Sequence, residues 1–148
     1  MDTAAYKLRA EDEIRDLIDQ WHESVLARDL DGIVSHYAPD ILAYDATARL
    51  QFKGVDEYRR HWEACFAMCP GPMIFEMHDL TIVAGEDVAF CHCLNRCGAT
   101  RENGEDSTSW MRVTVGFRKI DGRWKVVHEH FSAPFDPESG KALFDLQP

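Results

Sequence analysis

Asp45 is the residue whose type and position most suggest acid–base chemistry. It directly follows the apolar residues 41–44, which have the composition of a short β-strand. A carboxyl group at the end of such a strand, if partly withdrawn from water, has a raised pKa that suits proton transfer. The alternative is that Asp45 only caps the turn formed by residues 46–48. The sequence alone leaves both interpretations open.

Glu129, His92 and Arg96 are the other side chains that could handle a proton or hold a polar ligand. His92 and Arg96 lie in residues 88–97, which read as a strand, and Glu129 lies in the strand predicted at 123–133. Because side chains alternate along a strand, His92 and Arg96 share one face. Either could bond a ligand oxygen, and Arg96 suits a carboxylate. The alternative is a pair exposed to solvent at a rim.

Alternation also divides the last two predicted strands into faces. In residues 123–133 one face carries Trp124, Val126, His128, His130 and Ser132, and the other carries Lys125, Val127, Glu129, Phe131 and Ala133. In residues 108–119 the apolar face is Met111, Val113, Val115 and Phe117, and the mixed face includes Trp110, Arg112 and Thr114. A β-bulge would exchange the two faces, because a shift of one residue inverts every side chain.

The cysteines do not predict a disulfide framework or a metal site. There are five of them: Cys65, Cys69, Cys91, Cys93 and Cys97. An odd number favours free thiols. In the string 91–93, alternation sends the two cysteines and the intervening histidine to opposite faces, which does not suit a shared ion. The sequence also has no P-loop or nucleophile elbow, so we predict no metal and no cofactor.

Charge and hydropathy exclude several classes of partner. The chain has 26 acidic and 16 basic residues, a formal net charge of −10, which opposes binding to nucleic acid or to anionic lipid. No apolar run approaches the roughly 18 residues that a membrane span needs. Residues 1–7 lack an apolar signal core, so we expect a cytoplasmic location.

The order of the predicted elements places helices before strands. Apolar residues recur at helical spacing in residues 10–28 and 55–68, and a short helix capped by Asp29 is expected to run through Tyr37. The predicted strands are 41–45, 50–52, 73–83, 88–97, 108–119 and 123–133. This order predicts one α+β domain over residues 1–148, with the helices on one face of a bent sheet.

Two strings of residues resemble those of a known superfamily. Asp29-Leu30-Asp31-Gly32-Ile33-Val34, followed by Tyr37-Ala38-Pro39-Asp40, is similar to the second-helix signature of ketosteroid isomerases and SnoaL-like polyketide cyclases. Residues 121–134 resemble the last strand of the association domain of calcium/calmodulin-dependent protein kinase II. With the order of elements over residues 10–135, the chain resembles the nuclear transport factor 2-like (NTF2-like) superfamily. The resemblance implies a cone-shaped roll, its sheet strongly curved and mostly antiparallel, with a small-molecule pocket between helices and sheet.

The resemblance also implies roles for individual residues. Asp45 aligns with the catalytic aspartate of ketosteroid isomerases. Trp21 and Trp62 align with tyrosines that form or support their oxyanion hole, and Val115 replaces the aspartic acid that completes it. Since these donors are lost, the chain is not expected to be a true steroid isomerase.

In the same alignment, the faces that carry Glu129 and His92 line the pocket. The predicted catalytic residues are then Asp45, Glu129 and His92. The predicted ligand-binding residues are Trp21, Tyr44, Trp62, Arg96, Val115, Phe117 and Phe131. The opposite face, with Trp110, Arg112, His128 and His130, is expected to form a homodimer interface.

These assignments predict a cofactor-independent isomerase, dehydratase or cyclase. Asp45 would move a proton on a small apolar carbonyl or hydroxyl compound, and Glu129 would be its acid–base partner. A non-catalytic module for ligand binding or oligomerisation is the alternative.

Overall fold

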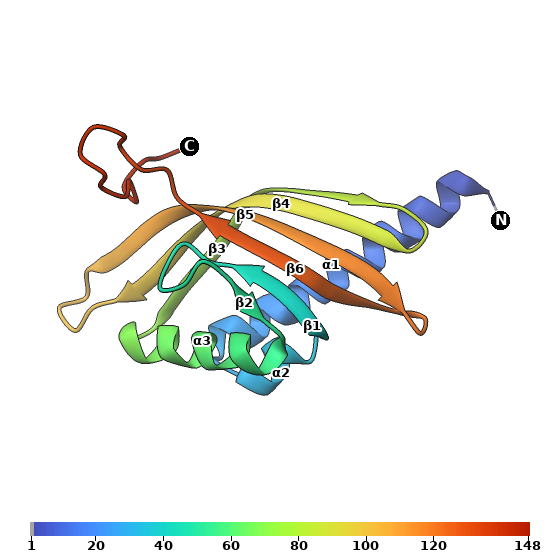
Figure 1. Ribbon diagram of the computed structural model, residues 1–148, viewed down its shortest axis with the longest axis horizontal. Coiled ribbons are helices and arrows are strands. Elements are labelled where there is room, and N and C mark those ends of the chain that lie inside the picture. The colour runs from blue at the N-terminus through green and yellow to red at the C-terminus, as the bar shows by residue number, and fades with distance from the viewer. Residues whose placement is uncertain (1) are drawn as a thin grey trace.

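Three helices lie on the concave side of one curved six-stranded sheet (Figure 1). The computed structural model describes residues 2–148. The helices are α1 (Thr3–Leu26), α2 (Leu30–Val34) and α3 (Val55–Met68), and the strands are β1 (Tyr37–Tyr44), β2 (Phe52–Lys53), β3 (Met73–Ala84), β4 (Val88–Thr100), β5 (Asp106–Ile120) and β6 (Arg123–Ser132). The strand order is β2-β1-β6-β5-β4-β3, with β1 parallel to β6 and the other neighbours antiparallel. The predicted α+β class is confirmed.

Helix α1 begins earlier than its apolar pattern predicts. Asp2 accepts a hydrogen bond from the backbone N–H of Ala4 at 3.2 Å, and this cap starts the helix at Thr3. The first turns are largely exposed to solvent, so they show no apolar period. Further along, one face is buried: Ala10, Ile14, Leu17, Ile18, Trp21 and Val25. Burial of each large apolar side chain of this face contributes roughly 1.5–3 kcal/mol.

The second helix is shorter than predicted, and this places a tyrosine in the core. Asp29 caps it as expected, accepting from the N–H of Gly32 at 3.1 Å. The helix ends at Val34, however, and Tyr37 already starts β1 and is buried. The pairing of β1 with β6 shifts between Tyr37 and Leu42, so Pro39 lies in an irregular stretch that tolerates a residue without an N–H group.

A β-bulge in β6 decides which side chains face the helices. The register with β5 shifts between Gly116 and Phe117, and residue 127 is left without a partner. The buried side chains are Trp124 and Val126 before the bulge and Glu129 and Phe131 after it. The prediction that Trp124 and Val126 share a face with His128 was wrong, because the extra residue inverts the alternation.

Helix α3 is fastened at its C-terminal end by Arg28. The guanidinium group donates to the carbonyl oxygens of Phe66 at 3.0 Å, Cys69 at 2.5 Å and Gly71 at 2.6 Å. A cation bonded to the last carbonyl groups of a helix stabilises that end. These bonds fix how α3 lies over the edge of the sheet.

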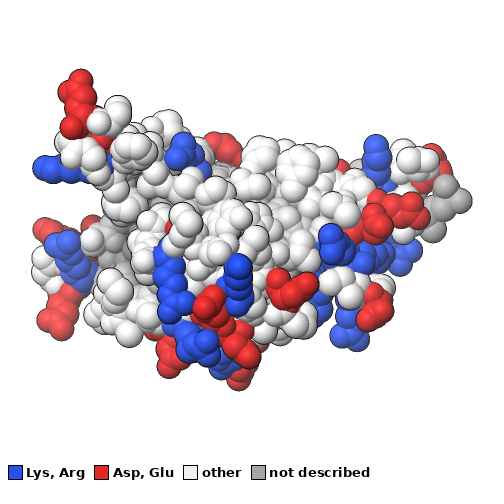
Figure 2. Space-filling model, viewed as in Figure 1, with Lys and Arg blue, Asp and Glu red and all other residues white. Residues whose placement is uncertain are grey.

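The surface carries both signs of charge. In the face shown in Figure 2, acidic and basic side chains are interspersed along the edges, and uncharged atoms cover the centre. Within residues 2–148, no helix is long and apolar enough to cross a membrane.

Candidate functional site

An apolar hollow lies between the helices and the concave face of the sheet. Its outer chamber has a volume of about 190 Å³ and includes Tyr58, Trp62 and Met111 in its wall. Its inner chamber is smaller, about 30 Å³, and lies deeper between α1 and the sheet. The two chambers have three wall residues in common: Phe75, Asn95 and Phe131. We therefore treat them as two parts of one hollow.

Glu129 is a buried carboxyl group in the wall of the inner chamber. Its side chain is 1% exposed, and its Oε2 accepts a hydrogen bond from the hydroxyl of Tyr58 at 2.6 Å. Burial raises the pKa of Glu129 to about 7, although hydrogen bonds from Tyr58 and Tyr37 act in the opposite direction. The carboxyl group can therefore exchange a proton near neutral pH.

Tyr37 links this carboxyl group to two indoles. The Nε1–H groups of Trp21 and Trp62 both donate to the Tyr37 hydroxyl oxygen, at 3.0 and 3.2 Å. Burial, and then the charge of Glu129, raise the pKa of Tyr37 well above its ordinary value, so the phenol stays neutral. The two tryptophans thus direct their N–H groups to Tyr37, while their rings line the inner and the outer chamber respectively.

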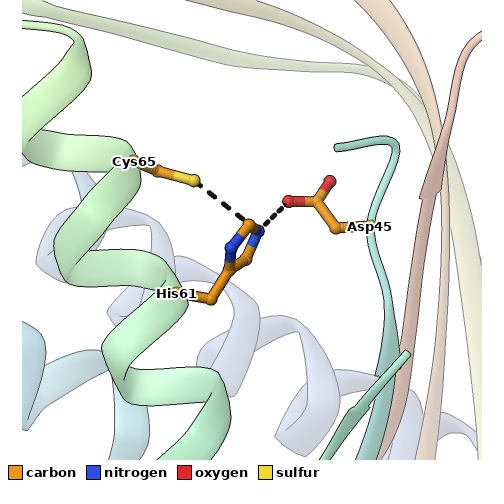
Figure 3. A group of neighbouring side chains, drawn as sticks. All are labelled: Asp45, His61 and Cys65. Carbon is orange, nitrogen blue, oxygen red and sulfur yellow. Dashed lines mark hydrogen bonds and ion pairs between the residues drawn. The ribbon is translucent and has the colours of Figure 1, made fainter. Parts of the chain in front are cut away.

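Asp45 lies in the wall of the outer chamber beside His61 and Cys65 (Figure 3). Its Oδ2 is hydrogen-bonded to Nε2 of His61, and the Cys65 sulfur lies 3.6 Å from the same nitrogen. Its Oδ1 accepts from the N–H of Ala46 at 2.7 Å. Asp45 therefore makes the predicted turn contact and also borders the hollow. The side chains of Asp45 and His61 are only 16% and 8% exposed.

The His61 ring is held in place by its neighbours. The ring of Phe52 stacks on it, with centroids 4.1 Å apart and an interplanar angle of 27°. Burial lowers the pKa of His61, but hydrogen bonds to Asp45 and Cys65 raise it more, to about 9. This pKa keeps the His61 ring protonated at neutral pH.

Asn95 is a buried wall residue whose side-chain oxygen has no hydrogen-bond partner. It is 0% exposed, and its Nδ2 donates to the backbone oxygen of Glu76 at 3.0 Å. This bond fixes the direction of the amide, and Oδ1 remains without a partner. It is the one buried side-chain nitrogen or oxygen without a hydrogen bond among residues 2–148. Such an acceptor costs about 1–3 kcal/mol, and a ligand donor could offset this.

Several residues predicted to bind a ligand do line the hollow. Val115 and Phe117 lie in the wall of the inner chamber, and Phe131 borders both chambers. Together with Glu129 they come from β5 and β6. The face inferred from the resemblance is therefore the concave one in β5 and, after the bulge, in β6.

The predicted face of β4 was wrong. Cys91, Cys93 and Asn95 line the hollow, so alternation sends His92 and Arg96 to the convex face. His92 is exposed there, and Arg96 forms an ion pair with Glu76 at 2.9 Å. Neither side chain is in the wall of either chamber.

Tyr44 also lies on the convex face. Its ring packs edge-on against those of His128 and His130, with centroids 4.9 and 5.4 Å away. Its neighbour Ala43 is the buried residue, and it is paired with Glu129. The assignment of Tyr44 to the ligand pocket is corrected accordingly.

Sequence reasoning missed five residues of the site: Tyr37, Tyr58, His61, Cys65 and Asn95. One signal was available, because His61 and Cys65 are four residues apart on a predicted helix and so share a face. Nothing in the sequence shows that this face meets Asp45.

Comparison with known proteins agrees with this architecture. The SnoaL-like domain family matches residues 14–136. An NTF2-like protein of unknown function from Pseudomonas putida is 52% identical, with a TM-score of 0.87 over 100% of this chain and 99% of that chain. No curated protein matches the sequence significantly.

Two more distant structures share the fold. A proposed dehydratase of the NTF2-like family from Streptomyces avermitilis has a TM-score of 0.72 at 15% identity, over 82% of this chain and 93% of that chain. A proposed ketosteroid isomerase from Shewanella frigidimarina has a TM-score of 0.66 at 21% identity, over 79% and 92%. At such identities the likeness concerns the fold alone. Since the family match spans most of the residues, the chain belongs to the SnoaL-like domain family.

Proposed function

We propose that this protein binds a small, largely apolar carbonyl or hydroxyl compound in the hollow and moves a proton on it. The reaction would be an isomerisation, a dehydration or a cyclisation that needs no cofactor. One observation carries the proposal: two carboxyl groups, Asp45 and Glu129, border the same apolar hollow from its outer and inner parts. The proposed dehydratase and isomerase that share the fold are compatible with this chemistry.

Asp45 is the proposed base. A ligand in the outer chamber would lie against its carboxyl group, and a hydrogen bond to His61 holds that group in place. The base takes a proton from the carbon next to a carbonyl group, and the electron pair moves toward the carbonyl oxygen. Return of the proton to another carbon completes an isomerisation. In a dehydration, the C–O bond of a neighbouring hydroxyl breaks and the group leaves, protonated, as water. A positioned base of this kind contributes about 10²–10⁴-fold to a rate.

Glu129 is the proposed second acid–base group. It lies behind Tyr58, which is itself in the wall of the outer chamber. A ligand long enough to reach the inner chamber would meet Glu129 at one end and Asp45 at the other. With a pKa of about 7, Glu129 can give or accept a proton at neutral pH.

Deuterium exchange tests the proposal before the natural substrate is identified. Small apolar ketones that bind the protein are incubated with it in D₂O, and NMR follows deuterium at the carbon next to the carbonyl group. The wild type should exchange faster than buffer, and Asp45→Asn should lose at least about 10²-fold of that rate. Asp40→Asn is the matched control, because Asp40 lies on the same strand but is exposed. Full exchange by the Asp45 variant would refute the proposed base. Binding without exchange would favour the non-catalytic alternative.

We also propose that the convex face of the sheet forms a homodimer interface. The register aligns His92, Thr114, His130 and Tyr44 in one row across β4, β5, β6 and β1. Beside this row, Phe90 and Val83 are paired and remain 45% and 46% exposed. The predicted interface residues Trp110, Arg112 and His128 belong to the same face. Aromatic, arginine and apolar side chains in one patch are typical of interfaces.

Analytical ultracentrifugation tests the interface. The wild type should sediment as a dimer, and Phe90→Asp should shift the population to monomer. Met68→Asp is the control, because Met68 is 84% exposed at the end of α3. A monomeric wild type, or a dimer unaffected by the Phe90 substitution, would contradict this proposal.

A further inference from the structure

Three potential metal ligands converge at one point on the wall of the outer chamber. A carboxylate oxygen of Asp45, a ring nitrogen of His61 and the sulfur of Cys65 all lie within 4.8 Å of one another (Figure 3). They come from two elements that face each other, helix α3 and the end of β1. The cluster brings together oxygen, nitrogen and sulfur, three of the ligand atoms that zinc prefers.

The contacts of this cluster do not fit a nucleophilic triad. In a triad the histidine bonds the nucleophile through one ring nitrogen and the acid through the other. Here Asp45 and Cys65 both meet Nε2 of His61. The ring therefore cannot relay a proton from the thiol to the carboxylate. Convergence on a single nitrogen instead places three potential ligand atoms around one shared position.

The spacing of Cys65 and His61 suits a tetrahedral ion, whereas Oδ2 of Asp45 lies closer to the His61 nitrogen than two zinc ligands do, so the carboxylate must draw back when an ion enters. Zinc–sulfur and zinc–nitrogen bonds of about 2.3 and 2.0–2.1 Å at a tetrahedral angle separate the two ligand atoms by about 3.6 Å. The observed distance from Cys65 Sγ to His61 Nε2 is 3.6 Å. His61 and Cys65 are four residues apart on α3 and so lie one turn above the other.

Neighbouring groups hold the ligands in these positions. The N–H of Ala46 occupies Oδ1 of Asp45 and leaves Oδ2 directed at the cluster. The Phe52 ring stacks on His61 and limits its rotation. Such outer contacts are the usual means by which proteins orient metal ligands.

We propose that Asp45, His61 and Cys65 form a three-ligand site for a divalent transition metal ion of the zinc type. All three residues line the outer chamber, so an ion held by them would border the space that a ligand would enter. The inference goes beyond the proposed function, because binding of the ion requires no turnover. A bound ion replaces the proton shared by Asp45 and His61, so Asp45 cannot then serve as a base. Zinc is therefore expected to slow the exchange reaction.

Cobalt(II) is the probe for this site. The full-length wild type, freed of metal by a chelator, is titrated with CoCl₂ and followed by absorption spectroscopy. One equivalent should produce a thiolate-to-cobalt charge-transfer band and the visible bands of a tetrahedral ion, and ZnCl₂ should displace them. Cys65→Ser should remove the charge-transfer band and weaken binding at least about tenfold. Cys69→Ser should leave both unchanged, since Cys69 lies at the end of the same helix but outside the cluster.

His61→Gln provides a second variant, and circular dichroism checks that every variant is folded. A wild type without a charge-transfer band, or a Cys65 variant that binds cobalt like the wild type, would overturn the metal site. These readouts need no substrate, so they are independent of the exchange assay. Loss of exchange in Asp45→Asn without any cobalt binding would sustain the proposed function and refute the metal site. Cobalt binding by the wild type, with no deuterium exchange by the wild type or any variant, would sustain the metal site and refute the proposed function.

Discussion

Tyr58 donates its hydroxyl hydrogen to Oε2 of Glu129 over 2.6 Å, and this bond joins helix α3 to strand β6 across the hollow. Both side chains are fully buried. The hydrogen bond from Tyr58 lowers the pKa of Glu129, whereas its burial away from water raises it. Burial is the larger of the two effects. The first prediction follows from that balance.

The stability of the protein should depend on pH through Glu129. Its pKa is about 7 in the folded protein, against an ordinary value of 4.5. Between these values the folded state binds more protons than the unfolded state, so the free energy of unfolding falls as the pH rises. The stabilisation is complete below pH 4.5 and is lost as the pH passes 7, with a total of about 3 kcal/mol.

Glu129→Gln removes this titration and keeps an oxygen that can accept from Tyr58. Urea denaturation at pH 5 and pH 8 should show a smaller decrease for the variant than for the wild type. Glu63→Gln is the control, because Glu63 is exposed on α3. Equal decreases in the wild type and the Glu129 variant would show that the buried carboxyl group titrates normally.

Tyr37→Phe should destabilise the fold more than Tyr58→Phe. The Tyr37 hydroxyl accepts hydrogen bonds from both Trp21 and Trp62, so its loss leaves two indole N–H groups without their acceptor. Each unsatisfied buried group costs roughly 1–3 kcal/mol. Loss of the Tyr58 hydroxyl removes one donor to Glu129. Denaturation of both variants at one pH measures the difference, and a reversed order would contradict the network.

Asn95 should favour ligands that carry a hydrogen-bond donor. Asn95 is in the wall of the hollow and its Oδ1 is unpaired, so a ligand hydroxyl that reaches this oxygen would relieve the cost of the buried acceptor. Asn95→Leu should reduce the preference for a hydroxylated ligand over its deoxy analogue by about tenfold. Arg96→Met is the matched control, because the next side chain along β4 points to the convex face. Titration calorimetry with each hydroxylated ligand and its deoxy analogue measures the preference of both variants. An unchanged preference in the Asn95 variant, or a lost preference in the Arg96 variant, would show that the faces of β4 are assigned incorrectly.

The sequence predicted features that depend on neighbouring residues in the chain better than features that depend on packing. Helical and strand periods predicted the elements well, since each depends on the solvent exposure of its own residues. They could not choose the inward face of β4, because period-two alternation is symmetric between faces. The apolar character of Cys91 and Cys93 in β4 indicated that their face is the concave one. The resemblance instead placed the face with His92 on the concave side.

The candidate site depends on contacts between distant elements. Asp45 was predicted from its position, but its partner His61 is 16 residues away on a helix whose placement is set by Arg28 and the core. Tyr37 was missed because the helix capped by Asp29 was expected to run through it, whereas Tyr37 starts the irregular strand β1. Such pairings arise from packing, which no local pattern records.

The protonation state of Glu129 inside the hollow is the most direct test of the proposed site. ¹³C NMR of protein labelled at the glutamate side-chain carboxyl carbons can follow each titration from pH 3 to pH 9, with Glu129→Gln identifying the Glu129 signal. The account predicts that this signal has its midpoint near pH 7, well above the ordinary value of 4.5. A midpoint near 4.5 would place Glu129 in contact with water and contradict a buried carboxyl group in the wall of an apolar hollow.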